Sequence, residues 1–457
     1  MLVADSMTTE ATEKRTTHLE RIRAAMQGGT MVPVRRMMLS LAPAEIARLL
    51  ESLPPSERGY VWELVDPDDE GEVLVHVNDE VRAGLIGLME ADELVAVTGG
   101  MEVDDLADLL TDLPETVISR VLRSMKELDR ERLESVLAYH EDSAGGLMNT
   151  DTITVRPDVT IDVVLRYLRM HVDVPDRTDM LFVVNRYGKY LGTVFLTRLL
   201  TNDEESTVGE IMDTSLEGIT DDTPATQVAT QFETLDLVSA PVVDAEGTLL
   251  GRITIDDVVD VIRDEAEHSL MSMAGLDEED DMFAPVIASA RRRAIWLGVN
   301  LATAFVAARV VGMFEATIEQ VVALAVLMPI VASMGGIAGS QTLTLMIRGL
   351  ALGQIERSNA RWLMMKESAV GLLNGLIWAA VVAIVTLLWF GSWRIGAVIA
   401  AALVINLLIA AISGVAIPVI LRRMSIDPAL AGSVVLTTVT DVVGFMSFLG
   451  LGALFLT

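Results

Sequence analysis

The spacing of apolar positions changes twice along the chain and divides it into three parts. Up to about residue 140, apolar residues recur at helical intervals in short segments that end at Leu-Pro, as at Pro54 and Pro114. Residues 141–263 instead alternate short apolar runs, turn residues and two helical segments, which is typical of an α/β fold. Residues 291–457 contain five apolar segments, each long enough to cross a membrane. The predicted spans are Ala294–Met313, Val321–Leu345, Val370–Phe390, Ile395–Leu421 and Ala429–Leu456.

Residues 31–140 are predicted to form an acidic helical repeat domain, preceded by a polar, flexible stretch at residues 1–30. The phrases LLESLPPSERGYVWELV and LLTDLPETVISRVLRSM resemble each other, which indicates a repeated helical unit. Asp104, Asp105 and Asp108 lie on one face of a predicted helix, while neighbouring leucines face the core. Such an acidic face is either a cation site or a solvated surface, and the sequence leaves both interpretations open.

Residues 141–206 and 207–263 have the same order of elements and form a tandem repeat. A strand, a helix and a strand hairpin recur, and LFVVNRYGKYLGTV in the first copy aligns with APVVDAEGTLLGRI in the second. This tandem resembles a pair of CBS domains, a fold that binds nucleotides or ions. Thr254 and Asp257 of the second copy resemble the ribose-contacting pattern of adenosine-binding CBS domains, so ATP is one expected ligand. An acidic linker helix, the plug helix, is expected at residues 264–290.

Charge separates the two ends of the chain as clearly as hydropathy does. A net charge of −31 and a mean hydropathy of +0.45 are unusual in one uniform protein, and they are explained when the two halves of the chain are considered separately. Residues 1–290 carry 23 basic and 59 acidic residues, whereas residues 291–457 carry 11 basic and 6 acidic ones. An acidic region followed by an apolar one predicts a membrane protein whose hydrophilic part attracts cations and repels nucleic acid. The first 30 residues lack the apolar segment of a signal peptide, so we expect the N-terminal region to stay in the cytoplasm.

The residue types limit the chemistry further. The chain has no cysteine, and all five histidines precede the membrane part. An ion path made from the remaining side chains offers oxygen ligands, which suit Mg²⁺, Ca²⁺ or Mn²⁺ better than zinc or copper. The sequence contains no phosphate-binding loop, no cysteine nucleophile and no histidine-based acid–base set, so we do not expect an enzyme.

Asp441 is the single carboxylate in the last apolar segment. A charge at this depth costs roughly 2.5–3.5 kcal/mol on insertion scales, and such residues usually mark a functional site. The alternatives are an ion path and a buried side chain that bonds a neighbouring helix. Basic residues gather at Arg348–Lys366 and at Arg422 and Arg423, which places these loops inside and, with five spans, the C-terminus outside. Because one carboxylate is a poor cation site, Asp441 also predicts a symmetric dimer.

Two membrane segments make the resemblance to a known family specific. The second span contains MPIVASMGGIAGSQTLTLMIRGLALG, in which Pro329 and the run Gly335–Gln341 are expected to break the helix. The last span reads DPALAGSVVLTTVTD. Together with the order of the other parts, these segments make the chain from about Met31 to its end resemble the MgtE family of magnesium transporters. The expected fold is a multi-domain membrane protein with an α-helical N-terminal domain, an α/β CBS pair and an all-α domain of five membrane helices.

The resemblance implies a homodimeric, Mg²⁺-selective, channel-like transporter of the plasma membrane, with its pore between the subunits. Asp441 resembles the family's central ion-site residue, and Asp427 resembles an acidic position at the cytoplasmic mouth of the pore. The other residues implied to line the pore are Thr437, Ser433, Ser340, Thr344 and Gly444. The residues that match the family's cation-sensing acids are Asp236, Asp257, Asp260, Glu265, Asp104 and Asp108. Cation binding at these acids would draw the linker helix towards the acidic domains and close the pore.

Departures from the family pattern keep other functions open. Ile337 and Ser433 stand where the family can have Asn, and His268-Ser269 replaces an acidic pair on the linker helix. Transport of Co²⁺ or Mn²⁺, or export in place of import, is therefore one alternative. A membrane-anchored CBS sensor that conducts nothing is another, and it would need neither a broken second span nor Asp441 at a subunit interface.

Overall fold

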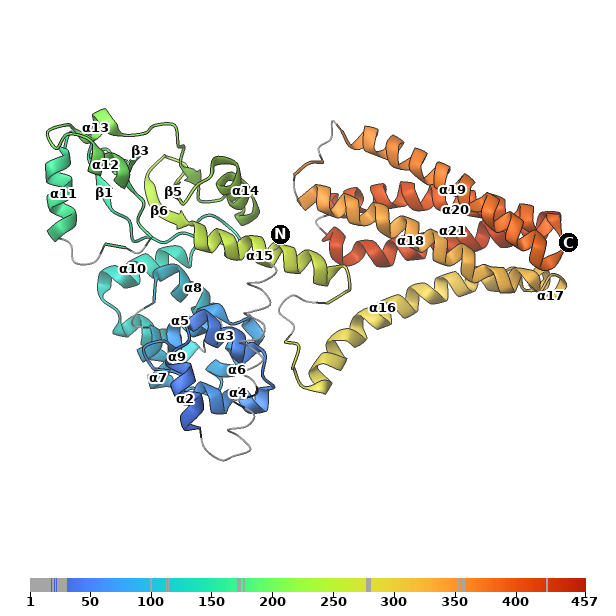
Figure 1. Ribbon diagram of the computed structural model, residues 1–457, viewed down its shortest axis with the longest axis horizontal. Coiled ribbons are helices and arrows are strands. Elements are labelled where there is room, and N and C mark those ends of the chain that lie inside the picture. The colour runs from blue at the N-terminus through green and yellow to red at the C-terminus, as the bar shows by residue number, and fades with distance from the viewer. Residues whose placement is uncertain are drawn as a thin grey trace. The chain divides into compact units, whose positions relative to one another are not determined.

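The computed structural model describes residues 18, 20, 22 and 31–457, except 99–100, 112, 114, 171–173, 176, 277–280, 352, 356–358 and 425. The stretch expected to be flexible, residues 1–30, lies almost entirely outside the described residues. The chain forms two compact units, which are described separately (Figure 1). The N-terminal unit comprises Met1–Ala266 and Glu279–Pro285, and the membrane unit comprises Glu267–Glu278 and Val286–Thr457.

The N-terminal unit begins with short helices whose ends follow from the sequence. These are α2 Val32–Met38, α3 Pro43–Glu51, α4 Pro55–Trp62, α5 Glu70–His76, α6 Asp79–Ile86, α7 Ala91–Val97, α8 Val103–Thr111, α9 Glu115–Ser124 and α10 Glu127–Val136. Three of them, α2 to α4, have a proline in the first turn, where the missing N–H costs no hydrogen bond. The Asn78 side chain accepts a hydrogen bond from the backbone N of Val81 (2.9 Å) and caps α6. Their apolar faces share one core, which includes Leu50, Leu74 and Val121.

Two three-stranded sheets with the same topology follow. The first contains β1 Thr154–Val155, β2 Met180–Val184 and β3 Tyr190–Phe195, and the second contains β4 Ile219–Thr220, β5 Ser239–Val243 and β6 Leu249–Thr254. In each sheet the first strand pairs parallel with the second, and the second pairs antiparallel with the third. The helices of this region are α11 Ile161–Met170, α12 Leu196–Thr201, α13 Val208–Ile211 and α14 Ala225–Leu235.

The two copies are joined at their hairpin turns. Gly188 and Gly247 have positive φ values of 78° and 79°, a conformation that favours glycine. The backbone N of Tyr190 donates to Gly247 O (3.0 Å), and that of Leu249 donates to Gly188 O (3.1 Å). The turns that the sequence places in equivalent positions therefore pair with each other.

Helix α15 (Ile255–Ser272) continues directly from β6, so it begins before the linker helix expected at residues 264–290 and ends within that range. Beyond it, the described chain at Asp281 is attached to the N-terminal helices. The Arg58 guanidinium donates to both Asp281 carboxylate oxygens, at 2.7 and 2.8 Å, and both side chains are buried. Arg58 also donates through Nε to Leu50 O (3.0 Å), so this ion pair is fixed to the backbone of α3.

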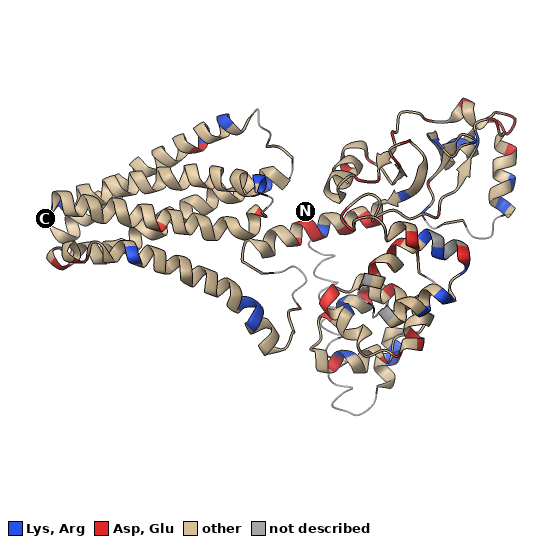
Figure 2. Cartoon of the chain, turned by 180° about the vertical axis from the view of Figure 1, so that it is seen from behind, with Lys and Arg blue, Asp and Glu red and all other residues tan. Residues whose placement is uncertain are grey.

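Among its described residues, the membrane unit contains five helices that are long and apolar enough to cross a membrane, which confirms the predicted number of spans. They are α16 Val286–Gly312, α18 Ala323–Ala351, α19 Ala360–Phe390, α20 Trp393–Arg423 and α21 Pro428–Phe455, with the short helix α17 Glu315–Gln320 after the first. Acidic residues are frequent along the N-terminal unit, whereas the membrane helices carry few charged residues (Figure 2). Glycines let α19 and α20 approach closely, because an added Cβ at Gly371 would lie 2.6 Å from the Ala411 side chain.

The predicted break in the second span is wrong. Helix α18 is continuous from Ala323 to Ala351, with Pro329 inside it. Its glycines accommodate side chains of neighbouring helices: an added Cβ at Gly335 would lie 2.2 Å from Asn406, and one at Gly339 would lie 3.0 Å from Leu436. Close helix packing is a common use of glycine in membranes, and the sequence pattern alone does not separate it from a break.

Candidate functional site

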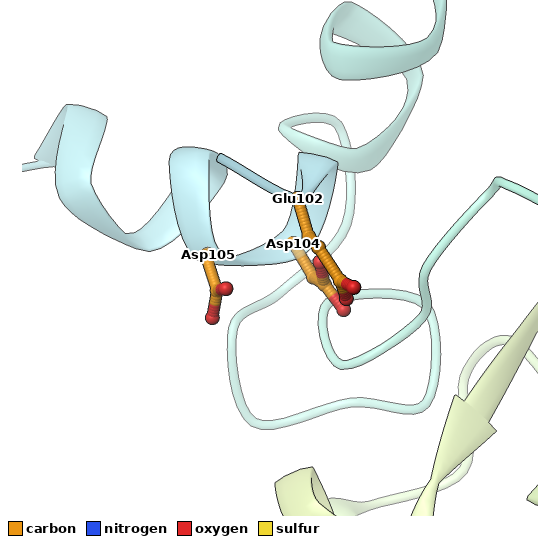
Figure 3. A group of neighbouring side chains, drawn as sticks. All are labelled: Glu102, Asp104 and Asp105. Atoms are coloured by element: carbon orange, nitrogen blue, oxygen red, sulfur yellow. The ribbon is translucent and has the colours of Figure 1, made fainter. Parts of the chain in front are cut away.

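Three carboxylates converge at the start of α8 in the N-terminal unit (Figure 3). Glu102, Asp104 and Asp105, here called the acidic cluster, each have an oxygen atom within 4.8 Å of the others. Asp104 is 7% exposed. Burial, and then the neighbouring charges of Asp105 and Glu102, raise the pKa of Asp104 to about 7. These oxygens could hold a hard divalent cation, since such ions prefer carboxylate ligands.

Asp257, in the first turn of α15, acts on the same cluster. Burial raises the pKa of Asp105 to about 7, and the charge of Asp257 is the next cause. Burial also raises the pKa of Asp257 to about 8, followed by the charges of Asp104 and Asp256. Because each of these carboxyl groups raises the pKa of another, α8 and the start of α15 repel each other when the groups are ionised.

Thr254 fixes the orientation of the Asp257 carboxylate. Oδ2 of Asp257 accepts from the backbone N of Thr254 at 3.2 Å and from its hydroxyl at 3.0 Å. The two residues of the predicted nucleotide pattern therefore contact each other, and Asp257 is also within electrostatic range of the acidic cluster.

Asn149 connects the acidic cluster to the second sheet. Its Nδ2 donates to Glu102 Oε2 (2.9 Å) and to Asp104 Oδ1 (3.3 Å), and its backbone N donates to Arg252 O in β6 (2.8 Å). Sequence reasoning missed Asn149, Glu102 and Asp256. Asn149 and Asp104 are 45 residues apart, so no local pattern relates them.

The other predicted sensing acids lie at separate positions. Asp108 is exposed, yet its charge contributes to the raised pKa of Asp105. Asp236 ends α14 in the left-handed conformation and is exposed. Asp260 pairs with Arg263 at 3.0 Å, and Glu265 lies further along α15. Of the six predicted sensing residues, Asp104 and Asp257 are the pair that burial and charge bring together most closely.

Helix α21 of the membrane unit carries Asp441, Thr437 and Ser433 at intervals of four residues, which places them on one face. All three are half-buried. Thr437 Oγ1 donates to Ser433 O at 3.0 Å and thereby satisfies its hydroxyl within the helix. Gly444, one turn further, is buried against Asn406 of α20.

An open groove of about 850 Å³ follows one side of α18. Its lining residues are Ser333, Gly336, Ile337, Ser340, Gln341, Thr344 and Leu345. Ser340 and Thr344, both predicted pore residues, are exposed here together with Ile337. Hydroxyl and amide groups are unfavourable against lipid, so this face requires a polar or protein neighbour.

Asp427 begins α21 as its N-cap. Its carboxylate accepts from the backbone N of Ala429 (2.9 Å) and of Leu430 (3.0 Å), which satisfies two free N–H groups of the helix. His268 Nε2, from the part of α15 that belongs to the membrane unit, lies 3.4 Å from Asp427 Oδ2. The histidine that departs from the family pattern thus contacts a predicted pore-mouth acid.

Comparisons with known proteins match the helical domain, both CBS copies and most of the membrane part. Residues 328–451 match the MgtE model, described as a divalent cation transporter, and residues 41–142 match the MgtE intracellular N domain. Residues 144–205 and 208–264 each match a CBS domain. The cytosolic domain of the Mg²⁺ channel MgtE in complex with ATP, a solved structure, is 30% identical over 53% of this chain and 99% of that one, with a TM-score of 0.49.

Similar proteins extend over most of the chain. The magnesium transporter MgtE of Thermus thermophilus is 32% identical over 329 residues, which cover 72% of this chain and 73% of that protein. The magnesium transporter MgtE of Bacillus subtilis is 27% identical over 351 residues, or 77% and 78% of the two chains. The resemblance inferred from the sequence is thereby confirmed, and the chain is a multi-pass membrane protein that belongs to the MgtE family.

Proposed function

We propose that this protein is a channel-like transporter of Mg²⁺ whose opening is controlled by cation binding at the acidic cluster. The observation that carries this proposal is the convergence of the Glu102, Asp104 and Asp105 carboxylates at the start of α8, within electrostatic range of Asp257 in α15. Transport of Mg²⁺ is supported by the relatives named as magnesium transporters and by the lone Asp441 in α21.

The cation-free cluster stores electrostatic repulsion. Two carboxylates about 5 Å apart repel by roughly 3 kcal/mol at an effective dielectric constant near 20. Mg²⁺ bound at the cluster cancels this repulsion and holds α8 against the start of α15. Two or three such pairs supply the roughly 5.5 kcal/mol that inverts a two-state equilibrium from 1:99 to 99:1. High Mg²⁺ on the side of the N-terminal unit therefore favours the closed pore.

We propose that the pore forms at the interface of a homodimer. The exposed polar face of α18, with Ser340 and Thr344, is then covered by the second subunit and by water in place of lipid. Two copies of Asp441 would share one ion, because Mg²⁺ dehydrates reluctantly and a carboxylate pair can hold its water shell. Asp427 would lie at the mouth of this path.

The orientation follows from the basic residues. Arg291, Arg292 and Arg293 begin the membrane part, and Arg422 and Arg423 end α20. We propose that these residues and the N-terminal unit are cytoplasmic, that the C-terminus is outside and that the membrane is the plasma membrane.

Mg²⁺ flux into proteoliposomes tests the transport proposal. Asp441→Asn removes the charge with little change of shape and is expected to lower flux strongly. Glu319→Gln, in the exposed helix α17, is the matched control and should keep it. Undiminished flux in Asp441→Asn would overturn the ion path and favour a non-conducting sensor. Competition by Co²⁺ and Mn²⁺ in both gradient directions separates the remaining transporter alternatives.

ATP binding at the second CBS copy remains a proposal of its own. Thr254 and Asp257 are in contact, but the Asp257 carboxylate is also within electrostatic range of the acidic cluster. ATP titration with and without Mg²⁺, in the wild type and in Thr254→Ala, distinguishes a nucleotide site from a cation site. ATP affinity that is unchanged by the substitution would contradict the proposed contact.

A further inference from the structure

Asn406 is a polar residue at the centre of the membrane unit. It lies in the middle of α20 and is 0% exposed. Its Nδ2 donates to Val331 O in α18 at 2.9 Å. Within the described part of the chain, its buried Oδ1 has no hydrogen-bond partner. An unpaired buried amide oxygen is costly, so this position is not explained by helix stability alone.

Two glycines from different helices make room for this side chain. A Cβ added to Gly335 of α18 would lie 2.2 Å from Asn406 Nδ2, and one added to Gly444 of α21 would lie 2.8 Å from it. Real Cβ atoms do not approach so closely, and both glycines are buried. The Asn406 amide therefore sets how closely α18 and α21 approach each other at this level.

Both glycines are close in sequence to residues of the proposed ion path. Gly444 follows Asp441 by three residues, about one turn of α21. Gly335 precedes Ser340 by five residues on the continuous helix α18. A change in the helix spacing at Asn406 is therefore transmitted to both residues through rigid helical segments.

We propose that Asn406 is a positioning residue of the ion path, which holds α18 and α21 at the spacing that Asp441 requires. Gly335 and Gly444 serve to admit Asn406, and Gly444 does not itself face the ion. This inference rests on the proposed role of Asp441. It differs from the sequence-based expectation, in which Gly444 lines the pore.

Exchange of side-chain size between Asn406 and Gly444 tests the inference. Gly444→Ala is expected to lower maximal flux and to raise the half-saturating Mg²⁺ concentration, each by roughly 10-fold, as when a residue that orients a metal ligand is lost. Asn406→Ala should have a similar effect, because it removes the spacer. In the double variant the new methyl group occupies the vacated space, so both parameters should return to within about threefold of the wild type.

Several outcomes would overturn the inference. A double variant no better than Gly444→Ala would mean that the glycine acts on the ion directly. Changes in unfolding temperature without any shift in half-saturating Mg²⁺ would assign Asn406 a merely structural role. If Asn406→Ala does not fold, Asn406→Ser replaces it in both the single and the double variant.

A control variant and Asp441→Asn separate failure of this inference from failure of the proposed ion path. Gln320→Ala removes an exposed amide from α17, outside the membrane-spanning helices, and should change neither flux parameter. If Asp441→Asn retains full flux, the proposed ion path fails. The unfolding temperatures of the size-exchange variants would still report whether Asn406 and Gly444 compensate each other.

Discussion

The two units hold their carboxylates in opposite ways. In the N-terminal unit, Glu102, Asp104 and Asp105 crowd together and face Asp257, so each ionised group raises the free energy of the next. In the membrane unit, Asp441 is the only ionisable residue of α21. Crowded acids store repulsion that a bound cation releases, which suits a sensor. An isolated acid instead lacks charge compensation until an ion arrives, which suits a path.

Glu367 marks a third arrangement, within the membrane unit. It is 4% exposed in α19, with Lys366 Nζ at 2.6 Å and Thr342 Oγ1 at 3.4 Å. A buried carboxylate next to an ammonium group is already compensated. Burial of a carboxylate in this unit therefore does not by itself indicate ion binding. Asp441 differs from Glu367 because α21 contains no basic residue.

Replacement of one Asp by Asn in each unit should give the largest difference in maximal Mg²⁺ flux. Asp441→Asn is expected to lower maximal Mg²⁺ flux on the order of 100-fold, because loss of one charge–ion interaction of roughly 3 kcal/mol corresponds to two decades. Asp257→Asn should leave maximal flux within about twofold, since the sensor does not conduct. Initial rates in proteoliposomes measure both. Equal losses of maximal flux in the two variants would contradict the assignment of Asp441 to the ion path and of Asp257 to the sensor.

Asp257→Asn should act on the gate instead. Removal of this charge relieves some repulsion, but it weakens cation binding at the acidic cluster more, because a carboxylate attracts a divalent cation about twice as strongly as it repels another carboxylate at the same distance. The Mg²⁺ concentration that half-closes the pore should therefore rise about 10-fold. Flux measured at a series of Mg²⁺ concentrations on the side of the N-terminal unit gives this value. Asp236→Asn, at the exposed end of α14, is the comparison variant. A larger rise of the half-closing Mg²⁺ concentration in Asp236→Asn would assign cation sensing to Asp236 and not to the acidic cluster.

Stability of the N-terminal unit should depend on pH in the opposite sense to ordinary paired carboxylates. The pKa values of Asp104 and Asp105 are raised to about 7 and that of Asp257 to about 8, above the value of 3.8 for an unperturbed Asp. The folded state therefore binds more protons than the unfolded state, and stability falls as pH rises from about 4 to about 8. Unfolding temperatures at pH 6 and pH 9 in a chelator should show this fall.

Mg²⁺ should remove most of that pH dependence, because the bound ion compensates the ionised cluster. The double variant Asp104→Asn and Asp257→Asn is the control, and its unfolding temperature should respond less to both pH and Mg²⁺. An unfolding temperature that rises between pH 6 and pH 9 in the wild type would contradict the repulsion at the cluster.

Asp108→Asn should give the smallest effect. Asp108 is exposed, and interactions of exposed charges are weakened by solvent, so the half-closing Mg²⁺ concentration should change by less than about twofold. The flux titration used for Asp257→Asn applies here as well. A shift as large as that of Asp257→Asn would extend the acidic cluster along α8.

The sequence predicted what depends on local periodicity. The five spans, the CBS repeat and the hairpin turn in each copy all follow from patterns within a few tens of residues. Asn149 could not be found this way, because it meets Asp104 through folding of distant segments. The predicted break in α18 failed because glycines that bend a helix and glycines that admit a neighbour look alike. A lone amide in the apolar segment Ile395–Leu421 was the available hint to Asn406.

The Arg58–Asp281 ion pair has a mechanical consequence. Only residues 282–285 lie between Asp281 and Val286, where α16 begins. Such a segment spans at most roughly 17 Å when fully extended. With the ion pair formed, the chain that joins the N-terminal helices to α16 is therefore only these few residues long, without the whole length of α15 in between. Loss of the ion pair would lengthen this connection, because it would then run through all the residues that follow α15.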